Sequence, residues 1–138
     1  MSEDHCNFLF VIINQSVMNL KYSIGLDVSS KKINACMSII DEKQKVAVKS
    51  SCVIANTLKG FESLKDWISK CQKEEIPVVV CMEATGIYHE NCAYYLFENG
   101  FTVSIILSNK AKKYLEAIGL KSKNDSIDAK GLAQMGAE

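Results

Sequence analysis

Four acidic residues of this sequence lie at positions where an uncompensated carboxylate would be unfavourable. Asp27 ends an alternating apolar segment, and Glu83 ends the unbroken apolar run 78–82. Asp125 and Asp128 follow near the end of the sequence, three residues apart. Neighbouring carboxylates in a half-buried site repel each other unless they share a proton or bind a divalent cation. The four residues are therefore candidates for a metal-dependent site.

Each acid has a simpler interpretation when it is taken alone. A strand-end Asp such as Asp27 can cap a turn, here with Ser29. Asp125 and Asp128 can act as the N-cap and the first-turn acid of a helix, where they complement the helix dipole. All four together favour a different interpretation, because carboxylates from two strands and one helix suit two hard cations such as Mg²⁺, which also bind substrate phosphate.

Hydrophobic periodicity predicts the elements that position these acids. A period of two predicts a meander of antiparallel strands over 22–28, 32–41 and 46–54. The period then lengthens, which predicts a helix begun by Asn56 or Thr57 as its N-cap. The inward face of this helix is expected to carry Leu58, Phe61, Leu64, Ile68 and Cys71.

The second half of the sequence alternates strands with helices. Strands are expected over 78–82, ending on Glu83, and over 101–107. The intervening helix is predicted over 87–99, with Gly100 at its end and with Tyr88, Cys92, Tyr95 and Leu96 buried. A helix from Ser108 to Gly119 follows, and 121–138 is expected to start one more helix, which would bear Asp125 and Asp128 on one face.

The order β-β-β-α-β-α-β-α, with a further acidic helix, predicts a ribonuclease-H-like (RuvC-like) α/β fold. Right-handed crossovers would place the later strands parallel to the first, in a five-stranded mixed sheet flanked by helices. The carboxyl ends of strands 22–28 and 78–82 would then meet at one edge, where ligands of open α/β sheets bind. Asp27 and Glu83 are expected to come together there. Residues 22–138 form this one domain, and residues 1–21 are expected to be a poorly ordered or loosely docked tail.

Composition limits the possible partners and compartments. The 16 Lys and 16 acidic residues cancel, and there is no Arg, so net charge makes no case for a nucleic-acid partner. The six Cys are scattered without a C-x-x-C motif, which argues against zinc and for a reducing cytoplasm. The longest amino-terminal apolar run, 8–13, is too short for a signal peptide or a membrane span.

Lysines are concentrated in one part of the chain. Between residues 110 and 130 there are six Lys and three acidic residues. Lys112, Lys113, Lys121 and Lys123 are candidates for contacts with a nucleic-acid backbone beside the metals. A solvated helix face and loop would explain the same pattern. His89, near Glu83, could assist proton transfer, although a surface or capping histidine is the simpler interpretation.

Three sequence blocks carry a family resemblance. Residues 24–29 (IGLDVS), 82–88 (MEATGIY) and 123–129 (KNDSIDA) resemble the signature blocks of the DEDD-type insertion-sequence transposases, relatives of the Piv DNA invertase with a RuvC-like amino-terminal domain. The three blocks occur in the family's order and at compatible intervals, and the similarity extends over about 22–138.

The resemblance implies a metal-dependent site for DNA cleavage and strand transfer. Asp27, Glu83, Asp125 and Asp128 correspond to the metal-binding tetrad, which holds Mg²⁺ or Mn²⁺, with Asp27 bridging two ions and Asp125 acting as a ligand or orienting a bound water. Thr85, Gly86 and Tyr88 would shape the loop after the second acid. The family implies DNA as partner, a structured guide RNA, a homo-oligomer, and a carboxyl-terminal domain with a nucleophilic Ser. That domain is absent from this sequence, so transposition by this chain alone is not expected.

Two other functions fit the same residues. An actin-like phosphotransferase also ends its first strand on Asp before small hydroxyl residues, although Val28 stands where its phosphate loop usually has Gly. A catalytically silent module for nucleic-acid binding or assembly is the other alternative. Such a module would bind nucleic acid independently of Mg²⁺ and of Asp27.

Overall fold

The computed structural model describes residues 17–84, 86–107, 113–114, 116–117 and 128–137. The alternating segments form three strands, β1 (Asn19–Val28), β2 (Lys32–Asp41) and β3 (Val46–Ala55). These are followed by α2 (Leu58–Cys71), β4 (Val78–Glu83), α3 (Glu90–Glu98), β5 (Thr102–Ile106) and α5 (Ala129–Ala137). The predicted alternation of strands and helices is confirmed.

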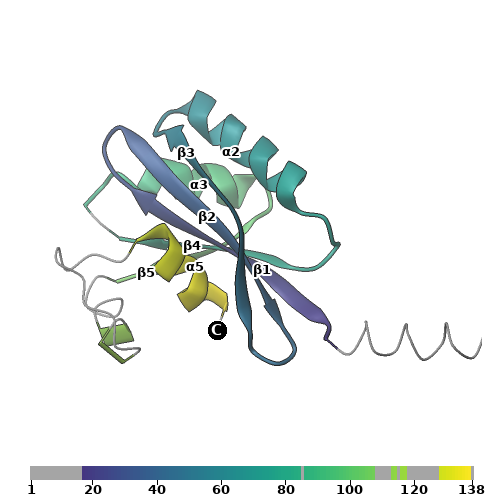
Figure 1. Ribbon diagram of the computed structural model, residues 1–138. Helices are drawn as coiled ribbons and strands as arrows, with labels where there is room; N and C mark the ends of the chain where they lie inside the picture. The colour runs from purple at the N-terminus through teal and green to yellow at the C-terminus, as the bar shows by residue number, and fades with distance from the viewer. Residues whose placement is uncertain (1–16, 85, 108–112, 115, 118–127, 138) are drawn as a thin grey trace, which may run out of the picture.

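The five strands form one mixed sheet in the order β3-β2-β1-β4-β5 (Figure 1). β1 pairs with β2, and β2 with β3, in antiparallel fashion, whereas β4 runs parallel to both β1 and β5. The first strand is therefore central, as the sequence predicted. Its carboxyl end lies beside the carboxyl end of β4.

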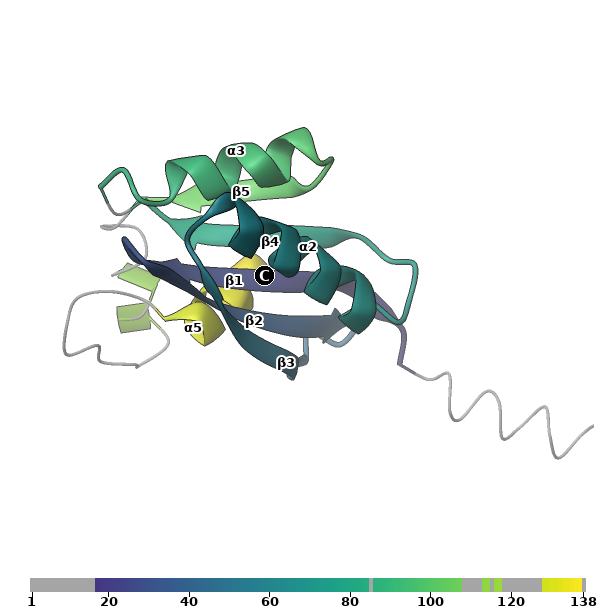
Figure 2. The same cartoon turned by 90° about the horizontal axis from the view of Figure 1, so that it is seen from above.

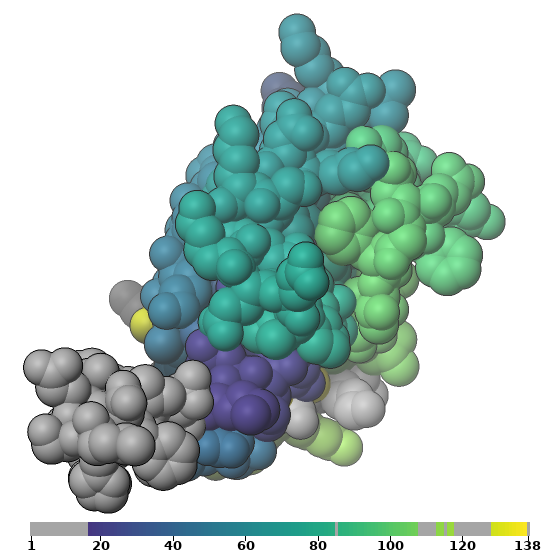
Figure 3. Space-filling view, turned by 90° about the vertical axis from the view of Figure 1, so that its right-hand side faces the viewer, coloured from purple at the N-terminus to yellow at the C-terminus, as the bar shows by residue number. Residues whose placement is uncertain are grey.

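Helices cover both faces of this sheet. Seen from above, α2 and α3 lie over one face and α5 lies against the other (Figure 2). Figure 3 shows α2 and α3 side by side at the surface. The larger core lies under these two helices, because the even-numbered residues of β1, from Tyr22 to Val28, meet the buried faces of both. The smaller core, under α5, contains Cys81, Ile106 and Leu132.

The face beneath α5 is built from small residues, which let the helix approach the sheet closely. A methyl group built on Gly25 would lie within 3.0 Å of the backbone O of Ala129 and of the backbone N of Ala133. Two residues earlier, the hydroxyl of Ser23 donates a hydrogen bond to the backbone O of Ala133. Glycine at position 25 is thus required for α5 to sit directly on β1.

Local signals explain the ends of α2 and α3. Thr57 is the N-cap of α2, since its hydroxyl accepts the backbone N–H of Gly60 at 3.1 Å. After α3, Gly100 adopts a φ of +86°, which fits its predicted role at the helix end. Phe61, Leu64 and Ile68 face the core as expected.

Two predicted core positions are wrong. Leu58 is 63% exposed, because it is the first residue of α2 and burial along this helix begins only at Gly60 and Phe61. Tyr88 is 51% exposed, because the chain forms a turn over 86–89 and α3 begins only at Glu90, so the helical spacing that placed Tyr88 inward does not apply. Tyr95 does pack against the core, beside Phe61.

Both ends of the domain also differ from expectation. β1 begins at Asn19, so residues 19–21 belong to the sheet and not to the predicted tail, of which residues 1–16 lie outside the described residues. The last helix was expected to carry Asp128 on its face. It begins at Ala129, with Asp128 just before it. The prediction of a helix over 108–119 is tested only at residues 113–114 and 116–117, which are helical.

Cysteines serve as packing residues within the part of the chain that the structure covers. Cys36, Cys81 and Cys92 are buried free thiols, and Cys52 and Cys71 are partly buried. Burial raises the pKa of Cys81 to about 11 and that of Cys92 to about 12, which keeps both protonated at neutral pH. Among the helices so described, none is long and apolar enough to cross a membrane.

Candidate functional site

The register of the sheet places Asp27 and Glu83 at neighbouring positions. The last paired residues of β1 and β4 are Leu26 and Met82, and the next residue on each strand is the acid. Aligned residues on parallel strands project to the same face, and neighbouring strands lie about 4.8 Å apart. This face is the one covered by α5, because Gly25 and Cys81, one alternation earlier, both contact that helix.

Asp128 reaches the same edge from α5. Its carboxylate accepts the backbone N–H of Gly131 at 2.8 Å, and its backbone O accepts the N–H of Leu132, so Asp128 is the N-cap of the helix. The simpler interpretation of this residue as a helix cap is therefore correct. The cap also fixes the carboxylate at the entrance to a pocket that contains Asp27.

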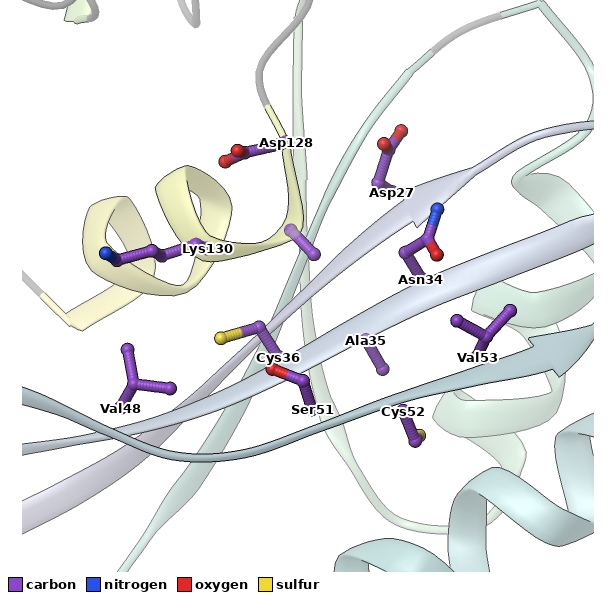
Figure 4. Close-up of a pocket in the computed structure, with 11 residues that line it drawn as sticks. Asp27, Asn34, Ala35, Cys36, Val48, Ser51, Cys52, Val53, Asp128 and Lys130 are labelled. Atoms are coloured by element: carbon purple, nitrogen blue, oxygen red, sulfur yellow. The ribbon is translucent and has the colours of Figure 1, made fainter.

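The pocket lies between α5 and the exposed side of β2 and β3, with a volume of about 540 Å³. Figure 4 shows the carboxylates of Asp27 and Asp128 on its open side, with the amide of Asn34 beside Asp27. Asn34 is the residue paired with Asp27 across β1 and β2. Lys130 also lines the pocket, but it extends away from both carboxylates (Figure 4).

Electrostatics couples the two carboxylates. Partial burial is the larger cause of a raised pKa at Asp27, and the negative charge of Asp128 raises that pKa further. The charge of Lys32, on the next strand, acts in the opposite direction and is the smallest of the three effects. The folded protein therefore holds Asp27 in an environment that disfavours its negative charge. A cation bound between Asp27 and Asp128 would relieve this repulsion.

Glu83 lies in a different environment. Its side chain is only 6% exposed, and it does not line the pocket of Asp27 and Asp128. Among the residues that the structure covers, no three His, Cys, Asp or Glu side chains lie close enough together to hold one metal ion. The structure thus brings Asp27 and Asp128 together at one pocket and places Glu83 at the neighbouring strand end to Asp27, outside that pocket. Asp125 lies outside the described residues.

The donor set fits a hard divalent cation. Asp27, Glu83 and Asp128 offer only carboxylate oxygens, Asn34 adds an amide beside Asp27, and oxygen ligands are those that Mg²⁺ and Mn²⁺ prefer. The only thiol on the pocket wall that is fully buried, Cys36, belongs to a packing cluster with Ala129 and Ala133. A soft-metal site is therefore not indicated here.

The predicted nucleic-acid contacts are covered only in part. Lys113 is exposed, as a phosphate contact requires, whereas Lys112, Lys121 and Lys123 lie outside the described residues. In the loop after Glu83, Gly86 adopts a φ of +59°, a conformation that favours glycine, and Thr85 is not described.

Sequence reasoning missed three features of this edge. Asn34 lines the pocket because the register of β1 and β2 pairs it with Asp27, and Lys130 lines it because of the position of α5. For Lys130, the one available signal was its proximity to Asp128 in the sequence. His89 is not a surface residue, since it is only 8% exposed. It occupies the N-cap position of α3, as the simpler interpretation allowed, but its side chain makes no cap bond, and its buried Nδ1 has no hydrogen-bond partner among the described residues.

Comparisons with known proteins agree with this architecture. The family model of the DEDD transposases of the IS110 type matches residues 24–138. The pilin gene-inverting proteins of Moraxella bovis and Moraxella lacunata are each 29% identical over 118 residues, which are 86% of this chain and 35% of theirs. The chain thus spans about a third of the length of these curated relatives.

A solved structure supports the fold. Thermus thermophilus RuvC superposes with a TM-score of 0.55 at 13% sequence identity, covering 84% of this chain and 90% of that one. At this identity the likeness establishes the RuvC-like, ribonuclease-H-like fold and nothing finer. Because the family match covers all but the first 23 of its 138 residues, the chain belongs to the DEDD transposase family of the IS110 type.

Proposed function

We propose that this domain cleaves and transfers DNA strands with the help of divalent cations held by its acidic edge. The observation that carries the proposal is the pairing of the half-buried Asp27 with Asp128 across one pocket. The raised pKa of Asp27 is an unfavourable feature for the isolated protein, and it becomes useful once a cation neutralises both carboxylates. Membership of a transposase family agrees with this chemistry.

In this proposal the residues have distinct roles. Asp27, Glu83 and Asp128 would supply carboxylate ligands from β1, β4 and the N-terminus of α5. Asp125 remains a predicted ligand. Bound Mg²⁺ or Mn²⁺ would stabilise the charges that develop on the attacking and leaving oxygens of a phosphodiester. The chain itself orients these ligands, because the cap of α5 and the register of β1 and β4 fix the backbone at each acid.

DNA as the partner, the guide RNA and a homo-oligomeric assembly are inferences from the family. We infer that residues 22–138 act as the catalytic domain of such a protein, whose curated relatives are longer than this chain. The family match favours this over the actin-like phosphotransferase. Lys130 on the pocket wall and Lys32, whose charge acts on Asp27, are described cations near the acids, and Lys113 is exposed, as a contact with a DNA backbone requires.

Thermal melting with and without millimolar Mg²⁺ or Mn²⁺ tests the metal site. A cation at a hundred times its Kd that binds only the folded state adds about 2.7 kcal/mol, which raises the Tm of a domain of this size by roughly 10 °C. We expect that rise in wild type and its loss in the variant with Asp27→Asn and Asp128→Asn. Asp66→Asn removes an exposed carboxylate from α2 and should leave the rise intact.

A DNA assay then separates the two remaining functions. The chain is incubated with labelled duplex and four-way-junction DNA, with and without Mn²⁺. Cleavage or retention that requires both Mn²⁺ and Asp27 supports the proposal. DNA retention that is indifferent to Mn²⁺ and to Asp27→Asn would instead establish a catalytically silent binding module.

A further inference from the structure

The two chain segments that leave the sheet after Asp27 and Glu83 are tied together by a single side chain, Asn56. Its Nδ2 donates hydrogen bonds to the backbone O of Ser29 at 2.8 Å and to the backbone O of Tyr88 at 3.0 Å. Ser29 follows Asp27 by two residues, and Tyr88 lies in the turn that follows Glu83. Both acceptors are carbonyl oxygens, so the amide nitrogen and not its oxygen must face them.

Asn56 is itself held firmly against the first of these segments. Its backbone N–H donates to the backbone O of Lys31 at 2.9 Å, so residue 56 is hydrogen-bonded to the turn after β1 through both its backbone and its side chain. That turn is closed by further bonds, in which the backbone N–H and the hydroxyl of Ser29 both donate to the backbone O of Lys32 at 2.9 Å.

The first turn of α2 packs close to Asn56. A methyl group built on Gly60 would meet backbone atoms of Ala55 far inside van der Waals distance, so the first turn of α2 is pressed onto the end of β3. Asn56 lies between the turn after β1, to which it is hydrogen-bonded, and the first turn of α2, and both restrict its movement. The amide is therefore a rigid link between the strand ends that bear the two acids.

We propose that Asn56 is a positioning residue, which holds the carboxyl ends of β1 and β4 in the relation that lets Asp27 and Glu83 bind cations. This inference rests on the proposed metal site. The side chain of Asn56 donates to backbone carbonyls and not to an acid of the described residues, so its effect acts through the backbone. Outer partners that orient metal ligands typically change metal affinity by about 10- to 100-fold when they are removed.

Binding of Mn²⁺ alone, measured from the electron paramagnetic resonance signal of the free ion, tests this role in the full chain. We expect Asn56→Ala to weaken Mn²⁺ binding about tenfold or more. Asn56→Asp keeps the size of the side chain but removes both donors, and it should also lose the link. The matched control is Thr57→Ala, which removes the neighbouring cap bond to Gly60 and leaves the bonds of Asn56 in place.

Amide hydrogen exchange supplies a readout that does not involve metal. The N–H of Ser29 and the N–H of Glu90, which donates to the backbone O of Ile87 at 3.2 Å, report on the two linked turns. Both should exchange faster in Asn56→Ala and at the wild-type rate in Thr57→Ala. An unchanged rate at both amides would overturn the link.

The metal measurements separate this inference from the proposed function. If wild type binds Mn²⁺ and Asn56→Ala binds it within twofold of wild type, the positioning role is refuted and the metal site stands. An equal loss in Thr57→Ala and Asn56→Ala would also refute it, because general destabilisation would then explain both. If wild type and every variant bind no Mn²⁺, the proposed metal site fails, and with it the purpose assigned to Asn56.

Discussion

Gly25→Ala is the substitution that most directly tests how α5 is placed against the sheet. The added methyl group would lie within 3.0 Å of two backbone atoms of α5, those of Ala129 and Ala133, and 2.9 Å from Cβ of Leu132. A backbone atom cannot rotate out of the way as a side chain can. The helix must therefore move away from β1, and Asp128, the residue that caps it, must move as well.

The expected magnitude follows from this geometry. Overpacking of a well-packed core costs about 1–3 kcal/mol, and backbone obstacles place this site at the upper end. Ala has less conformational entropy than Gly in the unfolded chain, and this difference offsets about 0.4–1 kcal/mol of the destabilisation. A net loss of roughly 2 kcal/mol corresponds to a fall in Tm of about 6–10 °C for a domain of this size.

The same substitution should disable the proposed metal site. Moving α5 separates Asp128 from Asp27, so the cation-induced rise in Tm should fall to a small fraction of the wild-type rise. The assay is thermal melting of the full chain, monitored by circular dichroism, with and without millimolar Mn²⁺. Gly136→Ala is the control, because its methyl group would meet chiefly the side chains of Ser23 and Cys81, at the far end of the helix from Asp128.

Two results would refute this reasoning. A Gly25→Ala protein that melts within 1 °C or so of wild type would show that the close contact of α5 with β1 is not needed for stability. A protein that is destabilised but keeps its full response to Mn²⁺ would show that cation binding does not depend on the position of α5.

Three further predictions use the same melting assay. Asp27→Asn should raise the Tm of the metal-free protein at neutral pH, because the raised pKa of Asp27 means that its charge is unfavourable in the folded state. The difference in Tm from wild type should shrink as the pH falls through that raised pKa. A variant that melts at a lower temperature than wild type at pH 7 would contradict this prediction. Asp128→Ala removes the cap of α5 and should lower the free energy of unfolding by about 1 kcal/mol. Asp128→Asn keeps the cap and should lose only the rise in Tm with Mn²⁺. Equal stability of the two variants would contradict the capping role. Tyr22→Phe removes the hydroxyl that accepts the backbone N–H groups of Lys73 and Glu74, each at 3.0 Å, and should lower the free energy of unfolding by about 1–3 kcal/mol. The rise in Tm with Mn²⁺ should be unchanged, because Tyr22 lies toward the opposite end of β1 from Asp27. Loss of that rise would refute this prediction.

The order of the elements could be predicted because it depends on local patterns. Apolar residues at a period of two identified β1, β2 and β3, and the change to helical spacing identified α2. Thr57 was one of two predicted N-caps, and it makes the cap bond. These signals depend on neighbours within a few residues, so they survive whatever the rest of the chain does.

Exposure was harder to predict, because a periodic pattern does not show where an element begins. Tyr88 has the spacing of an inward helical residue, yet it lies in the turn before α3 and is half exposed. Leu58 lies on the predicted inward face, but it is the first residue of α2, and burial along the helix begins only at Gly60 and Phe61. In both cases the local period was right and the boundary of the packed region decided the outcome.

The sequence by itself determined which residues could take part in the chemistry. These are Asp27 and Glu83 at strand ends, Asp125 and Asp128 three residues apart near the end of the sequence, and the three blocks that resemble those of a transposase family. Only the tertiary structure decided how they meet. The pairing of β1 with β4 places Glu83 beside Asp27, and the small residues under α5 bring Asp128 to the same pocket. The physical reason is that residue types and short periods are local, whereas register and helix placement depend on contacts between residues a hundred positions apart, such as Ser23 and Ala133.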